Sequence, residues 1–181
     1  RIPLWHRHMP GSAKGRPAPT ASGTNGKVVY FPSCVSRSMG TTKQAQDRRD
    51  LFEVIDSLLG KAGFASVLPE TVDGLCCGMP FASKGLPDTA SDSVKRLEEA
   101  LWNVSEEGAL PILCDTSPCT LRMIENFTRP LKIYEPSGFI HKYLMQHLNK
   151  TDSVPDIALH VTCSSRKMGL GSVMEELARA C

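Results

Sequence analysis

Short apolar runs alternate with stretches of helical periodicity along most of this 181-residue chain. The runs are apolar on successive residues, as in strands that are buried on both faces. They lie at 28–31, 65–68, 111–113, 132–134 and 157–161. Strands of this kind, when helices separate them along the chain, form mainly parallel sheets. The sequence therefore predicts an α/β fold.

The segments between the runs carry apolar residues every three or four positions, as on the inner face of a helix that packs against a sheet. Helices are expected at 41–62, at 89–107, from 117, at 139–148 and from 173. Thr41 or Thr42 is expected to cap the first helix, and Ser117-Pro118 opens the third with a capping hydroxyl followed by proline. Right-handed crossovers then predict a doubly wound, Rossmann-like layout with helices on both faces of the sheet.

Composition excludes several classes of protein. The net charge is only +2 and no run of arginine or lysine forms a patch, so no nucleic-acid partner is expected. No apolar stretch is long enough to be a transmembrane segment. Seven cysteines without an export signal indicate ligands or redox groups rather than a disulfide scaffold. A cytoplasmic location follows, or a peripheral one at the inner face of the membrane through a parent protein.

One heptapeptide occurs twice. Cys34 to Gly40 and Cys163 to Gly169 start 129 residues apart and are identical at five of seven positions. Both copies follow an apolar run and precede a helix, which indicates a duplicated unit. We therefore expect a linker or tail at 1–26, one complete cysteine-rich unit at 27–150, and the truncated start of a second unit at 151–181.

Five cysteines of the first unit are expected to converge. Cys34 and Cys114 follow strands, and the carboxyl ends of parallel strands share one edge of the sheet, where open α/β sheets place their sites. Cys119 lies in the first turn of a helix, which favours a thiolate. Cys76 and Cys77 precede Gly78, which lets backbone approach a bulky group.

Three kinds of chemistry suit such a set of sulfurs. A tetrahedral zinc site needs four ligands, normally as two close pairs, and the adjacent cysteines and the fifth one fit it poorly. A thiol–disulfide site favours Cys-x-x-Cys at a helix start, whereas four residues separate Cys114 from Cys119. An iron–sulfur cluster accepts thiolates from scattered loops and fits best. Spacing alone leaves all three open.

The stretches around these cysteines resemble a known family. Val29 to Cys34, Leu75 to Phe81 and Leu113 to Cys119, together with the repeat, are similar to the cysteine-rich "CCG" domain family. They look particularly like the carboxyl-terminal region of FAD-linked, iron–sulfur D-lactate dehydrogenases and glycolate oxidase-type oxidoreductases. The likeness covers roughly residues 27–181. It departs from the family at Cys114, since the related reductase has a final Cys-x-x-Cys.

The resemblance implies a ligand set and a function. It implies a [4Fe–4S] cluster held by the five cysteines of the first unit, and Cys163 as the first ligand of a second, incomplete site. The five are Cys34, Cys76, Cys77, Cys114 and Cys119. By the same resemblance, electrons from an FAD-binding domain of the same polypeptide pass through the module toward a quinone or cytochrome.

This chain alone is not expected to be catalytic. No Gly-x-Gly-x-x-Gly follows the first strand, so FAD is expected in a missing amino-terminal part of the parent oxidoreductase. Alternatives are a cluster-free docking domain of the same oxidoreductase and a zinc-stabilised domain. Asp115 and Glu135 follow strands, but nothing pairs them with a nucleophile. Arg37 is equally compatible with neutralising a cluster and with an ordinary role near a helix cap.

Overall fold

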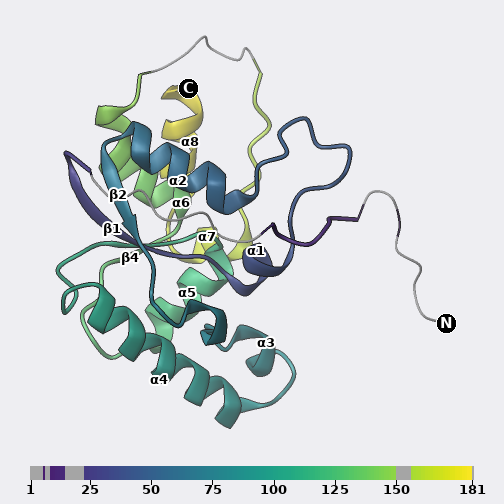
Figure 1. The fold of residues 1–181 in the computed structure, drawn as a ribbon, viewed down its shortest axis with the longest axis vertical. Coiled ribbons are helices and arrows are strands. Elements are labelled where there is room, and N and C mark those ends of the chain that lie inside the picture. The colour runs from purple at the N-terminus through teal and green to yellow at the C-terminus, as the bar shows by residue number, and fades with distance from the viewer. Residues whose placement is uncertain (1–5, 7–8, 15–22, 150–155, 181) are drawn as a thin grey trace.

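Four parallel strands form the centre of the molecule (Figure 1). The computed structural model describes residues 6, 9–14, 23–149 and 156–180. The strands are β1 (Gly26–Phe31), β2 (Phe64–Val67), β3 (Ile112–Cys114) and β4 (Ile133–Tyr134), in the order β2-β1-β3-β4. The predicted α/β fold with a parallel sheet is confirmed. In the described part of the chain, no helix is long and apolar enough to cross a membrane.

Helices connect the strands and follow the last one. The longer ones are α2 (Leu51–Lys61), α4 (Pro87–Val104), α5 (Ser117–Asn126) and α8 (Gly171–Ala180). Single turns form α1 (Cys34–Ser38), α3 (Met79–Ala82), α6 (Pro136–Phe139) and α7 (Cys163–Lys167). The helix expected at 139–148 is divided among the end of α6, a π-helical turn η2 (Ile140–Leu144) and a 3₁₀ turn η3 (Met145–His147). Another 3₁₀ turn, η1, spans Val72–Gly74.

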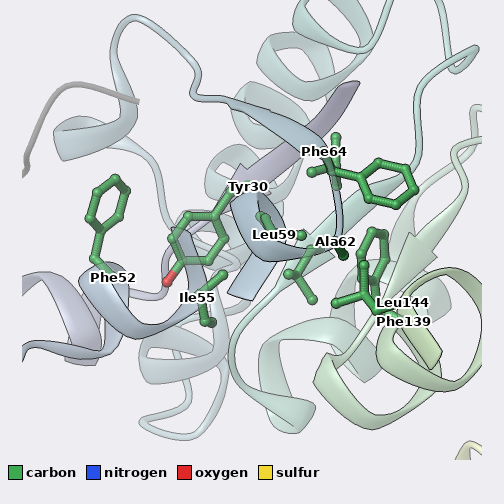
Figure 2. Close-up of a cluster of buried hydrophobic side chains, with 10 residues drawn as sticks. Tyr30, Phe52, Ile55, Leu59, Ala62, Phe64, Phe139 and Leu144 are labelled. Atoms are coloured by element: carbon green, nitrogen blue, oxygen red, sulfur yellow. The ribbon is translucent and has the colours of Figure 1, made fainter. Parts of the chain in front are cut away.

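Side chains alternate across β1 and create two separate cores. Val28 and Tyr30 face α2 and α6, whereas Val29 and Phe31 face α4 and α5. Figure 2 shows the first core, in which Tyr30 lies beside residues of α2, and Phe139 and Leu144 lie near Phe64. Both faces of the strands are therefore buried, which explains their uninterrupted apolar runs and confirms helices on both faces.

The start of α2 differs from the prediction. Asp50, rather than Thr41 or Thr42, is the cap, and its backbone N–H donates to the Glu53 carboxylate over 2.7 Å. Asp and Glu in this spacing form a capping box, which satisfies two amides at the helix start and outcompetes a threonine further upstream. Residues 41–50 form turns instead.

The strand expected at 157–161 is absent from the described residues. Ile157 and Leu159 are exposed, and no neighbouring strand lies beside them. A strand needs a partner for its backbone hydrogen bonds, so an apolar run alone does not form one. Much of the tail expected at 1–26 (residues 1–5, 7–8 and 15–22) lies outside the described residues; within the rest, Ser12 forms an antiparallel bridge with Met39 beside α1, and Gly26 begins β1.

The second core provides a test of this packing. Leu97 on α4 is fully buried, and its replacement by alanine leaves a cavity between α4 and the sheet. We expect Leu97→Ala to lower the free energy of unfolding by about 2–5 kcal/mol. Leu86→Ala, just before the same helix at a residue that is 50% exposed, should change it by no more than about 0.5 kcal/mol. Equal losses in urea unfolding would contradict the assigned core.

Candidate metal centre

The carboxyl edge of the sheet gathers the cysteines of the first unit. Cys34 begins α1 directly behind β1, and Cys114 is the last residue of β3. These two strands pair in parallel with Phe31 opposite Cys114, so both cysteines leave the sheet at one edge. Cys119 is in the first turn of α5, which starts three residues after β3. Cys76 and Cys77 lie in the loop between η1 and α3.

The five sulfurs interact with one another. Cys77 Sγ lies 3.1 Å from Cys119 Sγ. Burial raises the pKa of Cys34, and the neighbouring Cys76 and Cys119 raise it further; Cys119 likewise adds to the effect of burial on the pKa of Cys114. Each of the four segments that carry these cysteines therefore places a sulfur close enough to a sulfur of another segment for their charges to interact. The structure therefore brings the cysteine-bearing segments together at the sheet edge, with Cys77 and Cys119 in contact, and the use of all five as ligands stays a prediction.

These cysteines differ in exposure. Cys77 and Cys114 are buried in the second core, whereas Cys34, Cys76 and Cys119 are half-buried at its rim. The site therefore has an apolar floor and a partly open edge. Cys163, predicted to belong to a second site, is exposed at the start of α7, where the flanking Thr162 and Ser164 hydroxyls hydrogen-bond to Ser117 at the start of α5.

One sulfur of the group is a stable thiolate. Hydrogen bonds from the thiols of Cys114 and Cys77 lower the pKa of Cys119 to about 3. The pKa of Cys77 is raised, first by its hydrogen bond to Cys119 and then by burial. Burial also raises the pKa of Cys114. The chain thus stabilises negative charge on the sulfur at the start of α5.

A buried carboxylate ties the Cys34 segment to β3. Asp115 Oδ2 accepts a hydrogen bond from the Tyr30 hydroxyl over 2.8 Å, and Oδ1 accepts one from the Ser33 backbone N–H over 2.9 Å. Burial, followed by the Asp115 charge, raises the pKa of Tyr30, so this hydroxyl stays a donor. Asp115 therefore positions the turn that carries Cys34.

Two arginines tie the remaining segments together. Arg37, on the helix that Cys34 begins, donates from its two terminal nitrogens to the carbonyls of Val72 and Leu75, just before Cys76. Arg122, three residues beyond Cys119, donates from Nε to the Cys77 carbonyl over 3.0 Å. With Asp115, these contacts connect all four cysteine-bearing segments through charged side chains.

The repeat reproduces a local turn. Ser33 and Thr162 both cap a five-residue helix with nearly identical backbone angles (φ −64°, ψ 160° and φ −65°, ψ 160°), and each side-chain oxygen accepts from the backbone N–H three residues on. Arg166, however, is exposed, whereas its counterpart Arg37 is half-buried and donates to the carbonyls of Val72 and Leu75. The duplicated motif therefore encodes the helix start, and the surrounding loops determine what the arginine does.

The donor set suits a sulfur-bound metal group. It contains only thiols, one of them a stable thiolate, and Arg37 and Arg122 place positive charge beside it. Gly78 N–H also donates to Cys76 Sγ over 3.4 Å. Across the described ranges, no three His, Cys, Asp or Glu side chains form a ready-made site for a metal ion. The chemistry of the ligands, more than their spacing, supports metal binding here.

Comparison of the chain with family models, curated proteins and solved structures found no match. Functional inference therefore depends on the residues at the sheet edge and on the sequence pattern. Two of these residues had no functional signal in the sequence: Tyr30 looks like an ordinary strand residue, and Arg122 is marked only by its helical spacing from Cys119. Glu135 has a structural role, since its carboxylate accepts from Gly138 N–H and caps α6.

Removal of the Asp115 carboxylate should loosen the site. In Asp115→Ala, the buried Ser33 N–H and the Tyr30 hydroxyl lose their acceptor, so we expect a loss of about 2–4 kcal/mol in the free energy of unfolding. Tyr30→Phe, which removes one donor and leaves the other bond, should cost about 1 kcal/mol. Denaturation of reduced, metal-free protein measures both, with the exposed Asp92→Ala as control. A loss in the free energy of unfolding that is no larger for Asp115→Ala than for Asp92→Ala would show that Asp115 does not hold the turn before Cys34 in place.

The thiolate at Cys119 has a distinct pH dependence. Because its pKa lies well below the ordinary value of 9.0, at about 3, Cys119 should remain ionised as the pH falls from 9 and gain its proton only near pH 3. The ultraviolet absorbance of reduced, metal-free protein minus that of Cys119→Ser measures this ionisation. Cys114→Ala and Cys77→Ala should each raise the midpoint, since each removes a donor. A thiolate that appears only above about pH 8 would contradict the arrangement.

Proposed function

We propose that the chain is an iron–sulfur electron-transfer module of a flavin-linked 2-hydroxy-acid dehydrogenase, with D-lactate as the favoured substrate of the parent enzyme. The observation that carries the proposal is the gathering of five cysteine sulfurs from four separate segments at one sheet edge. The resemblance of these segments to the cysteine-rich CCG family supplies the cluster type and the redox partners.

Cys34, Cys76, Cys77, Cys114 and Cys119 would hold the group. A bound [4Fe–4S] cluster supplies reversible one-electron storage at this edge. The chain's own residues provide the surroundings: the apolar floor around Cys77 and Cys114 excludes water, and the Gly78 amide donates to sulfur. Hydrogen bonds to sulfur, burial and nearby positive charge are the means by which a protein sets the potential of such a group.

In this proposal the module receives electrons from an FAD-binding domain of the same polypeptide and passes them to a quinone or cytochrome. The oxidation of the hydroxy acid belongs to the flavin domain, and the chain alone does not perform it. The module works in the cytoplasm or at the inner face of the membrane, attached through the parent protein.

The short distance between Cys77 and Cys119 favours a second candidate, a dithiol–disulfide site. Their sulfurs are 3.1 Å apart, and Cys119 is the stable thiolate, which is the nucleophilic form in thiol–disulfide exchange. This candidate predicts that glutathione disulfide oxidises the pair and that dithiothreitol restores it. It predicts no iron in protein prepared without oxygen.

Oxygen-free reconstitution with iron and sulfide separates these functions. We expect roughly four iron and four acid-labile sulfide per chain, together with an EPR signal in one redox state. Cys76→Ser and Cys77→Ser should lose both, because each removes a proposed ligand.

Cys163→Ser is the matched control and should keep the iron and the signal, since Cys163 is exposed and is not one of the five proposed ligands. Zinc in place of iron would support the zinc-stabilised domain, and a metal-free, folded protein would support a docking domain without a cluster. Either result, or an equal loss of iron in Cys163→Ser, would overturn the proposal.

A further inference from the structure

A groove lies between α4 and α5. It encloses about 830 Å³, within the range of small-molecule sites. Its walls come from the turn before α4, one face of α4, and the end of α5 with the residues that follow it. The lining residues are Ala82, Gly85, Pro87, Ser91, Val94, Lys95, Glu98, Arg122, Asn126 and Thr128.

The groove contains two cations without a carboxylate partner. Lys95 comes from α4 and Arg122 from α5, and in the described part of the chain no ion pair engages either. Arg122 uses Nε to hold the Cys77 carbonyl, which leaves its terminal nitrogens as donors. Unpaired cations from two facing helices favour an anionic ligand.

The single carboxylate of the lining is already used. Glu98 is buried, and its oxygens accept from the backbone N–H groups of Thr128 and Arg129 and from the Thr128 hydroxyl. These donors occupy its oxygens, and no ion pair joins Glu98 to Lys95 or Arg122 among the described residues. The formal charge of the lining residues remains +1.

The amino-terminal end of α4 adds to the positive potential. Pro87, the first residue of this 18-residue helix, lines the groove together with Ser91 one turn later. The macrodipole and the unpaired amides of a helix start favour anions. Asp88 in the same turn offsets part of this effect but does not line the groove.

We propose that this groove is a binding site for a small organic anion, whose carboxylate or phosphate group pairs with Lys95 and Arg122. Val94, Ala82 and Pro87 provide apolar surface for a carbon skeleton. The inference is independent of the cluster, because it needs neither iron nor an oxidoreductase. Since Arg122 also holds the Cys77 carbonyl, an anion in the groove and the cysteine loop share one side chain.

Titrations of ¹⁵N-labelled, reduced, metal-free protein with inorganic phosphate and, separately, with succinate test the proposal. Ionic strength is held constant with potassium chloride, so that screening is equal throughout. We expect saturable shifts of the amide signals along the first half of α4, at the end of α5 and at Cys77 and Gly78. Saturation by phosphate alone or by succinate alone identifies which anionic group the site takes.

Lys95→Gln should weaken binding by about tenfold, because it removes one charged donor. Lys95→Arg should restore most of it. Arg96→Gln is the matched control, since it removes an exposed cation next to Lys95 that does not line the groove, and it should change the affinity by less than about twofold. Absence of saturable shifts with both probes, or equal weakening by Lys95→Gln and Arg96→Gln, would overturn the proposal.

Discussion

The hydrogen bonds of one buried carboxylate hold the cysteine edge together. Asp115 lies just beyond β3 and binds both the Tyr30 hydroxyl on β1 and the Ser33 amide in the turn before α1. The parallel pairing of β1 and β3 brings the two strand ends to one edge, and Asp115 then fixes the turn that carries Cys34. A buried carboxylate with two donors is costly to remove, so this contact makes the geometry of the site part of the stability of the fold.

The hydrogen bonds of Arg37 and Arg122 fix the loop that carries Cys76 and Cys77 in the same way. Arg37 holds the chain before Cys76 and Arg122 holds the carbonyl of Cys77, so a loop with little regular structure gains a defined place against α1 and α5. These cations also lie beside sulfurs that carry or share negative charge. Both side chains therefore position the cysteine loop; Arg37 also contributes to the lowered pKa of Cys119, and Arg122 also lines the groove between α4 and α5.

The sequence was sufficient to predict the sheet and the meeting of the cysteines, because apolar runs on successive residues specify buried parallel strands, and such strands end at one edge. The sequence did not predict the hydrogen bonds that hold the cysteine segments in place, since contacts such as Tyr30 with Asp115 join residues 85 positions apart. The strand expected at 157–161 was wrong for a related reason: hydrophobicity is local, whereas strand pairing requires a neighbour. The repeat predicted equivalent helix starts at Cys34 and Cys163, which the matching caps bear out.

The central claim is that these sulfurs share one inorganic group. X-ray absorption at the iron edge, on protein reconstituted without oxygen, tests it most directly because it reports the atoms bound to iron. If the cysteines share a cluster, the first shell of iron is sulfur alone and the second is iron, and both are lost in Cys77→Ser and retained in Cys163→Ser. A first shell of nitrogen or oxygen, or iron without an iron neighbour, would contradict it.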